Sequence, residues 1–274
     1  MRRRSAPPGI VEDMPTPFTH LHVAEQILLA VAGNGRSPLA EILAAEWPAF
    51  YLGSVAPDVQ AVSGMPRTQT HFYKIPPDPD NQAYPRMLAA YPELADVTAM
   101  PLAQAVFVAG YSAHLLLDLV WFRQILLPYF AEAPALGDRN HRSLLHHALL
   151  TYLDKEAYLA LPETAVSTLA VAQPTHWLPF VTDADLLSWR DLLVTQLQPG
   201  ADLQTVAIYA ARLRMPSADF AALLDNPDWV GTDLFGAAPI AEVHARFDTA
   251  VTASVQLIET YLEPLLAKYP SYDG

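Results

Sequence analysis

A histidine and an aspartate stand four residues apart inside a long apolar stretch of the chain. They are His114 and Asp118, and the stretch covers residues 101–130. Residues four apart on a helix lie on the same face, so both side chains would point the same way. A buried carboxylate is costly unless a positive charge offsets it, and a metal ion held by the pair would do so. A hydrogen bond between the two side chains inside an apolar core is the alternative that this pair leaves open.

Three further ionisable residues occupy comparable settings elsewhere. His20 opens an expected helix, Asp58 follows another in the sequence APD, and His71 lies in the sequence THFYK. Each is polar among apolar neighbours, and ionisable groups in such settings are uncommon. Because the chain has no cysteine, histidine, carboxylate and backbone oxygen would have to bind any metal. Together with the first pair, these positions favour a metal site over separate structural roles.

Four sequence segments together resemble the zinc-dependent phospholipase C family: TPFTHLHVAEQIL, YLGSVAPD, THFYK and VAGYSAHLLLDLVW. The resemblance covers about residues 16–155 and implies an all-α enzyme with a cluster of up to three zinc ions. It also implies the ligands of a first ion, namely Asp58, His71, His114 and Asp118. Asp118 would bridge to another ion that it shares with His20, and Asp58 would also be the candidate general base.

The chemistry that suits such a site is hydrolysis of a phosphodiester. Carboxylate and imidazole bind Zn²⁺ at ~2.0–2.2 Å. A zinc-bound water molecule loses a proton near neutral pH, and paired metal ions clamp a phosphoryl group from both sides. The sequence therefore predicts a zinc-dependent, phospholipase C-like hydrolase, in which metal-bound water attacks a small-molecule or lipid phosphodiester.

The chain departs from the family pattern at a further ion, which the family binds with two histidines and a carboxylate. Phe122 replaces the first histidine, one residue after Trp121, and Thr151 replaces the carboxylate. His147 matches the second histidine and stays a candidate ligand, with Asp154 as a substitute carboxylate one turn beyond Thr151. We therefore expect one or two zinc ions and not three. The competing hypothesis is a non-catalytic or metal-binding descendant with a degraded second metal site.

Several other histidines are expected to have structural roles. His22 lies two residues from His20, and His146 lies beside His147. Side chains at such spacings point in different directions on a helix. We expect His22 to pack or face solvent, and at most one of His146 and His147 to be a ligand.

Helices must position these residues, because no alternating strand pattern is present. The predicted helices cover about residues 20–32, 38–53, 84–95, 101–130, 138–160, 183–197, 203–213, 217–225 and 239–268. Pro48 is expected to kink the second helix, and residues 54–83 are expected to form a long loop, of a length that is usually functional or disordered. The predicted fold class is all-α, a multi-helix bundle around a long buried central helix, as in phospholipase C.

We expect one folded domain. Residues 1–17 contain Pro7, Pro8, Pro15 and Pro17 and are predicted to be a disordered leader. Residues 18–274 would form a single all-α domain. Within it, residues 18–160 would form the metal-site core, and residues 161–274 would add helices that complete the bundle.

Composition limits the partners. The 274 residues carry a formal charge of −13, with 52% hydrophobic and 16% charged residues. Such a surface repels phosphate backbones, so we expect no nucleic-acid partner, and a nuclease is disfavoured. No apolar run follows the N-terminal arginines, and polar side chains interrupt the 101–130 segment. We therefore expect no signal peptide, no transmembrane segment and a cytoplasmic protein.

Overall fold

The structure is a computed structural model that describes residues 14–33, 37–78, 80, 82–198, 200–201 and 204–267. Helices make up the regular structure of these ranges, in which no strand occurs. This confirms the predicted all-α class.

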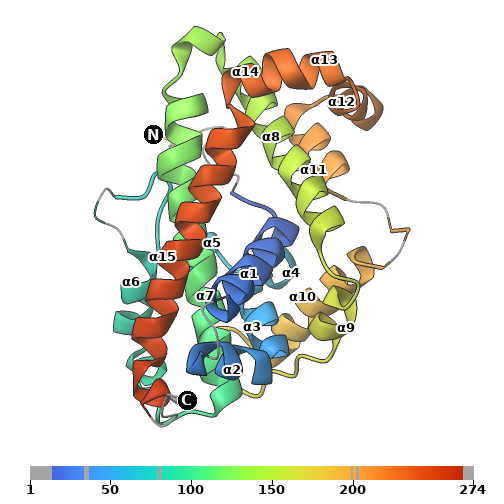
Figure 1. Cartoon of the computed structure of the whole chain (residues 1–274). Helices are drawn as coiled ribbons and strands as arrows, with labels where there is room; N and C mark the ends of the chain where they lie inside the picture. The colour runs from blue at the N-terminus through green and yellow to red at the C-terminus, as the bar shows by residue number, and fades with distance from the viewer. Residues whose placement is uncertain are drawn as a thin grey trace, which may run out of the picture.

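A long central helix organises the bundle. It is α7 (Leu102–Trp121), which continues as a π-helical segment, η3 (Phe122–Ala131). The last helix, α15 (Ile240–Leu266), lies along it, and α1 (Pro17–Ala32) packs against both α15 and α8 (Arg139–Ala160) (Figure 1). Among the described helices, Leu102–Ala131 is long and apolar enough to cross a membrane, but 89% of its most apolar window is buried inside the protein. Such burial is expected of a core helix.

The expected helix over residues 38–53 forms two helices. They are α2 (Pro38–Ala45) and α3 (Trp47–Gly53), and the chain turns at Glu46 between them. Pro48 lies in the first turn of α3, where a helix needs no backbone N–H donor. The proline cannot continue the preceding helix, so the kink predicted at Pro48 is a complete break at Glu46, two residues before it.

Two glycines let α3 and α7 cross at very short range. A Cβ atom on Gly53 would overlap the carbonyl oxygen of Phe107, and one on Gly110 would overlap the carbonyl oxygen of Phe50. Because glycine lacks a Cβ, the two backbones touch directly. The crossing brings the end of α3, where the following segment begins, beside the middle of α7.

Residues 54–83 contain more regular structure than the expected loop. Three short helices occur there: η1 (Ala56–Val59), α4 (Gln60–Ser63) and α5 (Arg67–His71), followed by α6 (Ala83–Ala90). Gly64 ends α4 with a positive φ of 70°. Each helix is too short to be stable alone, so the core against which it packs decides its formation.

The remaining described helices complete the fold. They are η2 (Pro92–Leu94), η4 (Pro134–Leu136), α9 (Ala165–Ala170), α10 (Asp183–Gln196), α11 (Gln204–Leu213), α12 (Ser217–Leu224), α13 (Pro227–Trp229), η5 (Val230–Leu234) and α14 (Phe235–Ala237). On α10, the Trp189 indole donates a hydrogen bond to the Val55 carbonyl over 2.8 Å. This bond fixes α10 to the segment that follows α3.

The predicted disordered leader covered residues 1–17. Residues 1–13 lie outside the described part of the chain. Met14 and Thr16 are buried, and α1 begins at Pro17. The chain is therefore already packed against the bundle before its first helix.

Candidate metal centre

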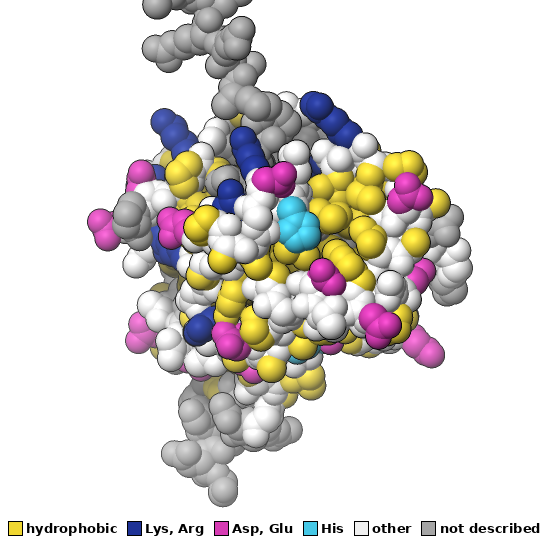
Figure 2. Space-filling model, turned by 90° about the horizontal axis from the view of Figure 1, so that it is seen from above, with side chains coloured by type: hydrophobic (Ala, Val, Ile, Leu, Met, Phe, Trp, Pro, Cys, Tyr) yellow, Lys and Arg dark blue, Asp and Glu magenta, His cyan; other side chains and the backbone are white. Residues whose placement is uncertain are grey.

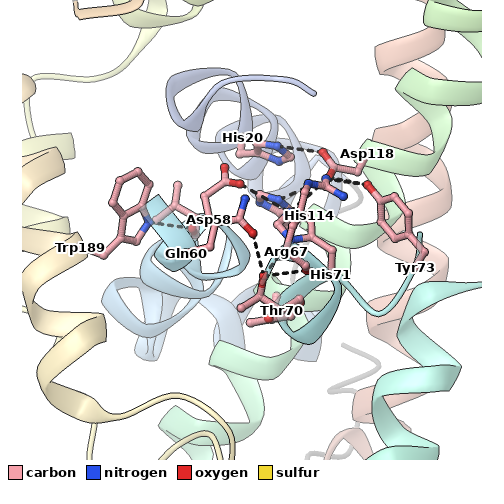
Figure 3. A network of polar contacts seen from close by, with 12 residues as sticks. His20, Asp58, Gln60, Arg67, Thr70, His71, Tyr73, His114, Asp118 and Trp189 are labelled. Carbon is pink, nitrogen blue, oxygen red and sulfur yellow. Dashed lines mark hydrogen bonds and ion pairs between the residues drawn. The ribbon is translucent and has the colours of Figure 1, made fainter. Parts of the chain in front are cut away.

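Five of the predicted ligand residues come together from four segments. His20 lies on α1, Asp58 in η1, His71 at the end of α5, and His114 and Asp118 on α7 (Figure 3). The His20 Nε2 atom is 3.4 Å from Asp118 Oδ1, and the His71 Nε2 atom is 3.5 Å from both Asp58 Oδ1 and Asp118 Oδ2. The His114 Nε2 atom lies 3.8 Å from Asp118 Oδ2.

These ligand atoms form two overlapping groups. In each group, one nitrogen or oxygen atom per residue lies within 4.8 Å of the others. The first group is His20, His114 and Asp118, and the second is Asp58, His71 and His114. The two groups share His114.

Most of the ligand atoms have no hydrogen-bond partner within the described residues, although they are buried. They are the Nε2 atoms of His20, His71 and His114 and the Oδ1 atom of Asp118. Buried polar atoms are normally satisfied, and a cluster of unsatisfied ones that face each other needs an explanation. A divalent cation explains it, because imidazole nitrogen and carboxylate oxygen are the donors that zinc prefers. The residues present therefore fit a zinc ion.

Neighbouring groups orient two of the imidazole rings. The Nδ1 atom of His114 is 2.8 Å from the Ser54 carbonyl oxygen, which the crossing of α3 and α7 places there. The Nδ1 atom of His71 is 2.9 Å from the Thr70 hydroxyl, which in turn donates to Gln60 Oε1. When Nδ1 is occupied in this way, Nε2 is left free to bind a metal, and the partner at Nδ1 fixes the orientation of the ring.

The environment favours neutral His71 and His114 and ionised aspartates. Burial, and then the stacked ring of His20 at 3.5 Å, lower the pKa of His114 to about 3. Burial would raise the pKa of Asp118, but His114, His20 and Arg67 outweigh it and lower that pKa. The pKa of Asp58 is also lowered, because His114 and His71 outweigh its burial. Neutral imidazole and carboxylate are the protonation states that bind a metal.

Arg67 and Tyr73 also contact the cluster, and the sequence analysis missed both. The Arg67 Nη2 atom is 2.5 Å from Asp118 Oδ2 and donates to the Tyr73 hydroxyl over 2.8 Å. The Tyr73 hydroxyl itself donates to Asp118 Oδ2 over 2.8 Å. One signal was available, since Arg67 precedes His71 by four residues and therefore shares its face of a helix.

A cavity of about 390 Å³ opens beside the cluster. Asp58 and Arg67 line it together with Trp189 on α10 and Tyr209 on α11. The Asp58 side chain is 21% exposed, whereas that of Asp118 is fully buried. Asp58 is therefore the carboxylate of the cluster that a bound molecule can reach.

His147 lies apart from these groups. Its Nδ1 atom is 2.6 Å from the Ser143 carbonyl oxygen, and its ring packs against Tyr209. It belongs to no group of three or more candidate ligands among the described residues, and its role as a ligand stays a prediction. Phe122 is buried in the apolar core, and the Thr151 hydroxyl donates to the His147 carbonyl over 2.8 Å.

The Asp154 carboxylate, which we considered as a substitute ligand, is held by two hydroxyls. Thr16 donates to its Oδ1 atom and Thr205 to its Oδ2 atom. Both oxygens thus have protein donors. The neighbouring His146 accepts a hydrogen bond at Nε2 from the Trp121 indole over 3.3 Å. The two hydroxyl contacts account for Asp154 without a metal, whereas the Nδ1 atom of His146 has no hydrogen-bond partner among the described residues.

Comparison with known proteins gives one family. A family model described as zinc dependent phospholipase C matches residues 19–178, which include every residue of the two ligand groups. No curated protein and no solved structure matches the chain.

Proposed function

This chain belongs to the zinc-dependent phospholipase C family, and on that premise we propose that it is a zinc-dependent hydrolase of phosphodiesters. One observation carries the proposal. Buried nitrogen and oxygen atoms of His20, His71, His114 and Asp118 face one another without hydrogen-bond partners in the described structure. A cavity lies beside them, lined by Asp58, which pairs with His71, and by Arg67, which contacts Asp118.

Bound zinc would polarise a phosphoryl oxygen and lower the pKa of coordinated water. The chain's own residues would do the rest. Asp58, ionised and partly exposed, would accept the proton of the attacking water as general base. The backbone contact of His114 and the hydroxyl contact of His71 would keep both rings in place during the reaction. No covalent intermediate on the protein is needed.

A lipid phosphodiester suits the cavity. Apolar side chains, among them Phe18, Leu192 and Ile208, share its lining with polar ones, among them Asp58 and Arg67. The apolar part could hold the hydrocarbon of such a ligand, while placed polar groups orient its phosphate. On the face in Figure 2, basic side chains are scattered among acidic and hydrophobic ones and form no continuous stripe that would track a nucleic-acid backbone.

A non-catalytic, metal-binding descendant of the family is the second candidate. Its specific support is the pair Phe122 and Thr151, which stand where the family has ligands of a further ion. Phe122 offers no donor atom, and the Thr151 hydroxyl is engaged by the helix backbone. In this alternative, the zinc site would stabilise the fold and the cavity would bind without hydrolysis.

The test uses Asp118→Asn. The wild-type chain should retain zinc through dialysis, counted by native mass spectrometry, and should hydrolyse phosphatidylcholine vesicles or bis(p-nitrophenyl) phosphate. Asp118→Asn should lose zinc and activity together, because a buried amide cannot replace the carboxylate charge. Asp78→Asn, at a side chain that is 73% exposed, is the matched control and should behave as wild type. An Asp118→Asn protein with full activity would reject the proposed function, and wild-type zinc binding without hydrolysis would favour the second candidate.

A further inference from the structure

Arg67 lies within the metal cluster, although it cannot bind a metal. It is the first residue of α5, and it lines the cavity together with Asp58. We propose that Arg67 is a substrate-binding residue, which donates a hydrogen bond from Nη1 to a phosphoryl oxygen of the substrate. This inference rests on the proposed function and assigns the residue that recognises the phosphate.

Of the two terminal nitrogens of the Arg67 guanidinium, one makes hydrogen bonds and the other makes none. Its Nη2 atom contacts Asp118 and Tyr73. Its Nη1 atom is buried and has no hydrogen-bond partner within the described residues. An arginine that leaves a buried donor unpaired forgoes a favourable interaction, unless a ligand completes it. A phosphoryl oxygen beside Asp58 would complete it.

Arg67 is also held in place before any ligand arrives. Its guanidinium carbon lies 4.8 Å above the centre of the Tyr73 ring, and the Tyr73 hydroxyl accepts from Nη2. The Arg67 side chain is 21% exposed, so most of it is enclosed, and it lines the cavity. A pre-oriented guanidinium loses little conformational entropy when it binds an anion.

The charge of the site supports an anionic ligand. Asp58 and Asp118 are ionised and Arg67 is charged, so the protein groups carry one net negative charge. One divalent cation would change this to one net positive charge. That is the charge that matches the single negative charge of a phosphodiester.

Arg67 also offers what the missing ligands would have supplied. A further metal ion would contribute positive charge toward a phosphoryl group, but Phe122 and Thr151 cannot hold it. The Arg67 guanidinium, which lies beside Asp118, contributes a fixed positive charge and a directed donor. The competing explanation is that Arg67 only neutralises Asp118 and never contacts a ligand.

The experiment measures binding of inorganic phosphate by isothermal titration calorimetry, to the full chain with and without zinc. Arg67→Gln should weaken phosphate binding about 10- to 100-fold in both forms, as expected for loss of a charge-assisted hydrogen bond. Arg67→Lys should keep part of the affinity, because it retains the charge but loses the planar fork. Arg86→Gln is the matched control, since Arg86 is half exposed and pairs with Asp78; it should bind phosphate as wild type does.

Zinc content and thermal melting of each variant separate the two roles. A substrate-binding Arg67 predicts unchanged zinc content with weakened phosphate binding. Unchanged phosphate affinity in both Arg67 variants would overturn the inference, and so would a wild-type protein that binds no phosphate. If the wild type binds no zinc but Arg67→Gln still weakens phosphate binding, the proposed function fails while the role of Arg67 stands.

Discussion

The imidazoles of the cluster depend on neighbours that bind no metal themselves. His114 meets the Ser54 carbonyl, and His71 meets the Thr70 hydroxyl, which is anchored by Gln60. Tyr111 on α7 donates its hydroxyl to the Thr70 carbonyl over 2.5 Å and so ties α5 to the central helix. These contacts at the Nδ1 side hold both imidazole rings in position, so a metal would not have to order them when it binds.

Asp154 makes stability depend on pH. Its burial raises its pKa to about 6, despite hydrogen bonds from Thr16 and Thr205. A folded-state pKa above the ordinary value means that the native protein prefers the protonated form. The contribution of the Asp154 side chain to the free energy of unfolding is therefore fully present at low pH and is lost as the pH rises through about 6.

Asp154→Asn, which mimics the protonated form, should stabilise the zinc-free protein by about 1–2 kcal/mol at pH 7.5 and give no gain at pH 4. Urea unfolding at the two pH values measures this difference. The exposed Asp78→Asn should change stability at neither pH. An equal gain at both pH values would contradict the assignment.

The sequence predicted the five clustered ligand residues, because histidine and aspartate among apolar neighbours are informative in themselves. The partners of those residues could not be predicted in the same way. Tyr73 looks like an ordinary aromatic core residue, and its contact with Asp118 depends on how α5 and α7 pack. Arg67 lies in a segment for which the sequence predicts a loop, and in a loop a spacing of four residues to His71 does not indicate a shared helix face.

At the scale of the helices, α3 and α7 cross with their backbones in direct contact. Gly53 and Gly110 allow the two backbones to touch, and the contact delivers Ser54 to His114. An added methyl group would meet backbone atoms, which cannot move aside as a flexible side chain can. The overlap between the added methyl group and the backbone would therefore push the two helices apart.

Gly110→Ala should therefore destabilise the protein by about 1–3 kcal/mol and also weaken zinc retention, because the Ser54 contact would shift. Gly236→Ala is the control, since nothing lies within 4 Å of a Cβ there, and it should be neutral or slightly stabilising. Urea unfolding and zinc counting measure both effects. A Gly110→Ala protein as stable as wild type would show that the crossing can open without loss.

The long helices were predictable and the short ones were not. Helical periodicity over 101–130, 138–160 and 239–268 reflects apolar faces that any bundle must bury. The short helices η1, α4 and α5 have too few residues for a periodic pattern. Their formation depends on packing against α7 and α10, and that information is distributed over distant parts of the chain.

For the whole molecule, a bound ion would join segments that are far apart in the sequence. His20 and Asp118 belong to different helices of the bundle, and Asp58 and His71 belong to the connection between α3 and α6. An ion that binds the folded chain and not the unfolded one stabilises the fold by mass action.

Removal of zinc with EDTA should lower Tm by about 5–10 °C at pH 7.5, as expected for loss of a tight ligand in a chain of this size. Differential scanning calorimetry with and without the chelator measures the shift. Asp118→Asn should show no shift with EDTA, because it holds no zinc. Identical melting of the wild type in both conditions would contradict a metal centre that links these segments.

Part of the cavity wall comes from a later region of the chain than the clustered histidines and aspartates. The clustered ligands come from residues 20–118, whereas α10 and α11 supply Trp189 and Tyr209 from the later part of the chain. Substitutions on α10 and α11 could therefore change which molecules enter the cavity without altering the clustered residues themselves.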